Sequence, residues 1–128
     1  MTAQDTAAPK SKDFLGRPVS AIFWWGLPLV VGWSADASSI PQVAKTFVWV
    51  GALAWMGAGC ALNAWRCHRL HCYIAAPVLF LGAIGVAAAA LGLAPMGSHT
   101  ASYEINASLV LVLLSFLVEP VWGKYRSR

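Results

Sequence analysis

The chain has 128 residues, of which 59% are hydrophobic before glycine is counted and only 11% are charged. Soluble domains average about 45–50% apolar residues with glycine included, and about 25% charged residues. A small soluble domain cannot bury such an apolar surplus, because its surface is large relative to its volume. The composition excludes an ordinary cytosolic enzyme and a disordered tail, and it predicts a membrane protein.

The net charge of +4 does not indicate a nucleic-acid-binding surface, because the basic residues follow the apolar pattern of the chain. They form three clusters with one outlier: Lys10, Lys12 and Arg17; Arg66 and Arg69; Lys124, Arg126 and Arg128; and Lys45. Such clusters flank membrane spans and set their orientation. We therefore expect the lipid bilayer, and no nucleic acid, as the partner of this surface.

Four apolar runs lie between these clusters, over about residues 19–34, 46–65, 73–93 and 105–121. A helix needs roughly 17–25 residues to cross the hydrocarbon core, so the first run is short and the fourth is near the minimum. Each run must be helical, because lipid offers no partner for an unpaired backbone group. The predicted fold is an all-α, polytopic bundle of four transmembrane helices.

Four spans place both termini and the link between the second and third runs on one side, which the basic clusters predict to be cytoplasmic. We expect a flexible cytoplasmic tail over residues 1–16, a transmembrane domain over 17–123 and a basic cytoplasmic tail over 124–128, in the inner (plasma) membrane. An alternative interpretation is a signal peptide cleaved near Ala37. The Pro28 and paired tryptophans of the first run favour a permanent span.

One segment concentrates cysteine and histidine, with Cys67, His68, His71 and Cys72 within six residues at a predicted membrane edge. Thiolate and imidazole are ligands for soft or borderline ions such as copper, zinc or mercury. In a continuous helix, Cys67/His71 and His68/Cys72 are pairs four residues apart that point in different directions. A single four-ligand metal site therefore requires a turn in this segment.

A stripe of soft and polar side chains leads to this segment: at helical spacing, Met56, Cys60, Asn63, Cys67 and His71 fall within an arc of about 80°. Met56 and Cys60 are relay positions if a soft ion moves along the stripe. The alternative is ordinary packing, since methionine and free cysteine both fill apolar cores.

Glu119 is the ionisable residue of the fourth run. A carboxylate at this depth is costly and needs a partner. We predict an ion pair with Arg66 or Arg69, and the alternative is a proton acceptor or hard ligand beside the Cys/His segment.

Known catalytic patterns do not occur: the chain has no glycine-rich phosphate loop, nucleophile elbow, paired carboxylates or Cys-x-x-Cys motif. We therefore predict no catalytic residues and no enzyme activity.

The stretch Asn63-Ala64-Trp65-Arg66-Cys67-His68-Arg69-Leu70-His71-Cys72-Tyr73, followed by Pro77, resembles a family of uncharacterised small prokaryotic integral membrane proteins. The resemblance implies four helices and an Arg-Cys-x-Arg-x-His-Cys link, with His68 standing where that family has glycine. A looser likeness is to small mercury-uptake membrane proteins. Those carry a vicinal cysteine pair inside a helix, whereas Cys60 has no neighbouring cysteine.

Three functions remain open at this point. The first is binding or transport of a soft metal ion by Cys67, His71 and Cys72 with His68. The second is a non-catalytic accessory subunit of a larger membrane complex, or a homo-oligomer. The third is a membrane thiol redox protein in which Cys67 and Cys72 cycle.

Overall fold

The computed structural model describes residue 15, residues 17–93 and residues 100–123. Seven helical segments make up these ranges: α1 (Pro18–Ala21), the π-helical η2 (Ile22–Gly26), α2 (Leu27–Ala37), α3 (Gln42–Cys67), α4 (Leu70–Ala90), α5 (Thr100–Ser115) and α6 (Val118–Trp122). They combine into four helices long and apolar enough to cross a membrane. The all-helical prediction is confirmed. The predicted tails, residues 1–16 and 124–128, lie outside the described residues except for Leu15.

The first span is continuous from Pro18 to Ala37, so it is longer than the predicted 19–34. Pro28 lies in the first turn of α2, directly after the wide turn of η2. A proline ring clashes with the carbonyl four residues earlier and has no N–H to donate. The wider turn, in which the Leu27 N–H bonds to the Ile22 carbonyl, accommodates this loss without ending the helix.

The second and fourth spans extend beyond the predicted 46–65 and 105–121 at both ends, whereas α4 begins and ends three residues before the predicted 73–93. Helix α3, the second span, begins at Gln42 and includes Lys45. The Lys45 ammonium donates to the Asp36 backbone carbonyl at 2.9 Å. Near the C-terminus, α5 and α6 are separated by a short break at Phe116 and Leu117. Pro120 explains this break, because its ring would clash with the Phe116 carbonyl in a continuous helix.

The link between α3 and α4 is a tight reversal centred on His68, whose φ of 55° and ψ of 36° are left-handed. His68 is the one non-glycine residue with positive φ among the described residues. This conformation normally favours glycine at the end of a helix. The His68 ring bonds to the Tyr73 hydroxyl at 2.7 Å and stacks on the Tyr73 ring, which joins the turn to α4.

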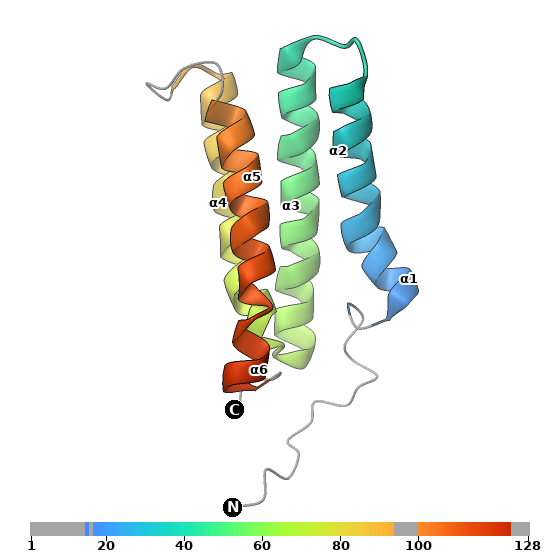
Figure 1. Ribbon diagram of the computed structural model, residues 1–128, viewed down its shortest axis with the longest axis vertical. Helices are drawn as coiled ribbons and strands as arrows, with labels where there is room; N and C mark the ends of the chain where they lie inside the picture. The colour runs from blue at the N-terminus through green and yellow to red at the C-terminus, as the bar shows by residue number, and fades with distance from the viewer. Residues whose placement is uncertain (1–14, 16, 94–99, 124–128) are drawn as a thin grey trace, which may run out of the picture.

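The helices pack in the order α2, α3, α4 and α5, with α3 and α4 making the most extensive contact. Figure 1 shows α5 in front of α4, with the α3–α4 link and α6 at one end of the molecule and the α2–α3 link at the other. Within the described residues, α2 makes no close backbone approach to α5. The Trp25–Phe116 ring contact, with centroids 6.2 Å apart, bridges the two spans near the α6 end.

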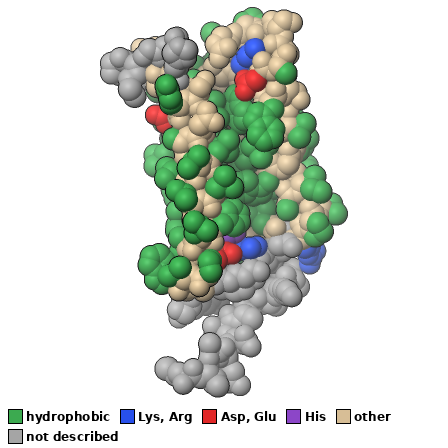
Figure 2. All heavy atoms as spheres, in the orientation of Figure 1, with side chains coloured by type: hydrophobic (Ala, Val, Ile, Leu, Met, Phe, Trp, Pro, Cys, Tyr) green, Lys and Arg blue, Asp and Glu red, His purple; other side chains and the backbone are tan. Residues whose placement is uncertain are grey.

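The outer faces of the helices are apolar, with exposed side chains that include Val19, Leu81, Leu113 and Val121. Figure 2 shows hydrophobic side chains along the length of the visible face and charged side chains gathered towards its two ends. This distribution fits a multi-pass membrane protein. Which side of the membrane each end faces stays a prediction.

Gly82 on α4 lies directly against Ser108 of α5. A Cβ at this position would overlap Ser108 Oγ and lie 3.0 Å from Ser108 Cβ. A Cβ on Gly51, in contrast, meets nothing within 4 Å. Small residues let membrane helices approach closely enough for dispersion to hold them together.

We expect Gly82→Leu to destabilise the bundle by about 1–3 kcal/mol, because the larger side chain forces α4 and α5 apart. Gly51→Leu is the matched control and should leave stability unchanged within about 0.5 kcal/mol. Unfolding of the purified protein in mixed micelles, followed by tryptophan fluorescence, measures both. Equal losses of stability in the two variants would contradict this packing.

Candidate functional site

A buried cluster forms where the last turns of α3 meet the first turn of α4. We call it the cysteine–histidine cluster and define it as Cys60 and Asn63 of α3, His71 and Cys72 of α4, and Glu119 of α6. The reversal at His68 creates it, because it lays the start of α4 along the end of α3. The first four side chains are at most 2% exposed.

Cys72 is the centre of the cluster. Its thiol lies beside the Cys60 thiol across the α3–α4 interface. The Asn63 amide donates to Cys72 Sγ at 3.5 Å, and His71 Nε2 lies 3.4 Å from the same sulfur. Both cysteines are free thiols. Two thiols in direct contact, with an imidazole beside them, form a compact set of soft ligands.

His71 connects the thiols to an ion pair. Its Nδ1 lies 2.5 Å from Glu119 Oε1, and the Arg69 Nε donates to the same oxygen at 2.9 Å. A carboxylate beside Nδ1 keeps a proton on that nitrogen, which leaves Nε2 to accept from the Cys72 thiol when the ring is neutral. The Phe116 ring stacks on His71, with centroids 4.2 Å apart. The result is a continuous chain from Arg69 through Glu119 and His71 to Cys72.

The predicted ion pair of Glu119 is confirmed, with Arg69 as its partner. The two side chains are 13% and 15% exposed, so the pair is largely shielded from solvent. The alternative prediction is that Glu119 acts as a proton acceptor or hard ligand beside the Cys/His segment. Its contact with His71 brings the two together.

The predicted metal ligands, which are Cys67, His71 and Cys72 with His68 as a supplementary ligand, are not gathered around one point. The Cys67 thiol donates to the Asn63 carbonyl at 3.1 Å, and His68 bonds to Tyr73. Only His71 and Cys72 of the four belong to the cluster. The described residues contain no group of three or more His, Cys, Asp or Glu side chains arranged to hold a metal ion. The turn that a four-ligand site requires is present, but it directs Cys67 and His68 to other partners.

The predicted relay stripe is also revised. Met56, Cys60, Asn63 and Cys67 are fully buried on α3, as a stripe along one face requires. His71 does not continue this stripe, because α3 ends at Cys67 and His71 belongs to α4. The sequence predicts Cys60 as a relay position, whereas in the structure Cys60 lies beside Cys72.

The roles of two residues at this site, Asn63 and Phe116, are not predicted from the sequence. Asn63 was noted only as part of the stripe, although an amide inside an apolar helix is itself a signal of a buried polar partner. Phe116, which stacks on His71, left no signal in the sequence, because an aromatic residue in an apolar run is unremarkable.

Comparison of the chain with family models, curated protein sequences and solved structures finds no match. The resemblance described above to small prokaryotic membrane proteins therefore stays a prediction.

The ion pair should stabilise the α4–α6 contact, and a double-mutant cycle measures its strength. We expect Glu119→Leu to destabilise the protein more than the double variant Arg69→Met/Glu119→Leu, because the single change leaves the arginine without this carboxylate. The coupling free energy should be about 0.5–3 kcal/mol. Additive effects of the two substitutions on unfolding would show that the pair contributes nothing.

Proposed function

We propose that this membrane protein binds one soft metal ion, with Cu(I) as the reference ion, between the thiolates of Cys60 and Cys72. The observation that carries the proposal is that these two buried thiols lie beside each other across the α3–α4 interface. Thiolates select soft ions, and Cu(I) and Hg(II) are stable with only two sulfur ligands in a linear arrangement.

Two-coordinate binding is compatible with the absence of a three-residue metal group among the described residues. Zn(II) is a poorer candidate, because protein zinc sites are almost always four-coordinate or keep three protein ligands. The expected preference is therefore for Cu(I) and Hg(II) over Zn(II). This narrows the broader expectation that copper, zinc or mercury would bind.

Charge balance also supports a monovalent ion. The resting cluster is neutral when the thiols are protonated, His71 is uncharged and Glu119 pairs with Arg69. Binding of Cu(I) to two thiolates displaces two protons. If His71 Nε2 keeps one of them and the other leaves, the cluster remains neutral. Neutrality matters here, because an uncompensated charge is expensive in an apolar bundle.

We expect the purified wild-type protein to take up one Cu(I) per chain under anaerobic conditions, measured by competition with a coloured Cu(I) chelator. Cys60→Ser and Cys72→Ser should each abolish binding at one equivalent, because each removes half of the ligand pair. Cys67→Ser is the matched control, since Cys67 is equally buried but bonds to the backbone.

This proposal fails if the wild type retains no Cu(I) in that assay. It also fails if Cys67→Ser loses the ion while Cys60→Ser retains it. Helical content, measured by circular dichroism, separates loss of the site from loss of the fold.

The same thiol contact favours a second candidate, a dithiol–disulfide couple. Oxidation would join Cys60 Sγ to Cys72 Sγ and release two protons, with two electrons passing to an external oxidant such as a diazene. This pairing differs from the Cys67–Cys72 cycle expected from sequence. The structural reason is that Cys67 bonds to the Asn63 carbonyl.

We expect diamide treatment of Cys67→Ser protein to remove both remaining thiols from reaction with a maleimide after denaturation. Wild-type protein, with its three cysteines, should keep one reactive thiol. Prior loading with Cu(I) should protect the pair from diamide, because the metal occupies both sulfurs. Unchanged labelling of the metal-free Cys67→Ser protein would exclude the redox couple.

A further inference from the structure

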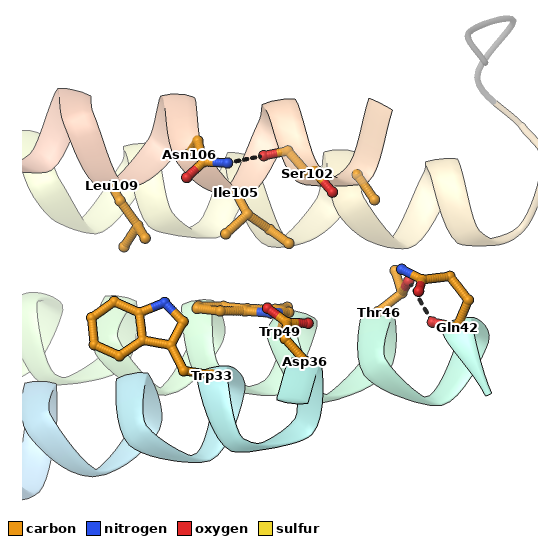
Figure 3. A pocket seen from close by; sticks show the side chains of 10 residues that line it. Trp33, Asp36, Gln42, Thr46, Trp49, Ser102, Ile105, Asn106 and Leu109 are labelled. Atoms are coloured by element: carbon orange, nitrogen blue, oxygen red, sulfur yellow. Dashed lines mark hydrogen bonds between the residues drawn. The ribbon is translucent and has the colours of Figure 1, made fainter. Parts of the chain in front are cut away.

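A second site lies at the opposite end of the bundle from the cysteine–histidine cluster. It is a cavity of about 100 Å³ between the α2–α3 pair and α5. Figure 3 shows its lining, with Trp33, Asp36, Thr46 and Trp49 on one side and Ile105 on the other. It arises because α2 does not approach α5, so the two spans leave a gap over α3.

The local sequence explains the aromatic wall of this cavity. Gly32 on α2 leaves room for the Trp49 ring. A Cβ added at Gly32 would lie only 2.8 Å from the nearest atom of that ring. The Trp49 indole N–H donates to Asp36 Oδ2 at 3.0 Å. Figure 3 shows the Trp49 ring edge-on, with one face turned across the cavity towards Ile105. The contact thus fixes a carboxylate beside the buried Trp49 indole, which lines the cavity.

The Asp36 carboxylate lines the cavity and accepts a hydrogen bond from Trp49. The Lys45 ammonium bonds to the Asp36 backbone carbonyl, and the described residues show no ion pair between Lys45 and the Asp36 carboxylate. The remaining lining adds hydroxyl and amide groups, among them Thr46, Ser102 and Asn106. The Thr46 hydroxyl and the Asn106 amide donate to carbonyls of their own helices, so they add polarity without adding charge.

We propose that this cavity binds a small methylated ammonium ion, with its charge opposite Asp36 and its methyl groups against Trp33 and Trp49. Indole faces attract cations, and aromatic cages are the usual protein receptors for quaternary ammonium groups. A quaternary ammonium also gives up its hydration more readily than a compact metal ion, which suits a small cavity with both aromatic and polar walls. The site is independent of the thiol pair and of its proposed metal.

The test uses the full chain in detergent micelles and radiolabelled tetramethylammonium in equilibrium dialysis. We expect Asp36→Asn to weaken binding about tenfold and Trp33→Leu to weaken it several-fold. Lys45→Gln should tighten binding, because it removes a competing positive charge. The matched control is Glu104→Gln on α5, which removes a carboxylate from the same end of the bundle but from a different pocket.

Competition distinguishes a cation site from a merely apolar one. Choline should displace the bound tetramethylammonium, whereas the uncharged carbon analogue of choline should not. The proposal is overturned if wild-type protein does not bind tetramethylammonium, if the uncharged analogue competes equally, or if Glu104→Gln weakens binding as much as Asp36→Asn. If Asp36→Asn fails to fold, tighter binding by Lys45→Gln supports the proposal and unchanged binding overturns it.

Discussion

The left-handed turn at His68 is the constraint on which the candidate site depends. A helix continuing through this segment would place Cys67 and His71 on one face, several turns along from Cys60. The reversal instead lays the first turn of α4 against α3, so that Cys72 meets Cys60. Glycine adopts this conformation at the lowest cost. His68 adopts the same conformation at a higher conformational energy, and its contacts with Tyr73 hold the turn against α4.

A second constraint is that polar groups inside an apolar bundle must satisfy one another. Cys72, His71, Glu119 and Arg69 do so as a chain in which each member contacts the next. The chain crosses from α4 to α6 and therefore also holds the C-terminal segment against the bundle. The same contacts provide a place for a displaced thiol proton, so one set of interactions serves both stability and the proposed ion chemistry.

The unequal packing of the helices gives the molecule two chemically different ends. At the α6 end, the Phe116 ring contacts both Trp25 of the first span and His71 of the cysteine–histidine cluster. At the other end the spans diverge, and a cavity lined by Trp49 and Asp36 opens between them. One end presents soft, enclosed ligands, and the other presents a carboxylate within an aromatic wall.

The sequence by itself determined the four apolar helices, because lipid permits no other backbone structure for such runs. It also indicated the Cys/His segment and an arginine partner for Glu119, since ionisable groups at membrane depth need partners. Only the tertiary structure decided which two cysteine thiols lie together. Cys60 and Cys72 are brought together by the direction of one turn and the packing of α3 on α4. Spacing along one helix cannot reveal such a pair, because its geometry is set by a contact between two helices.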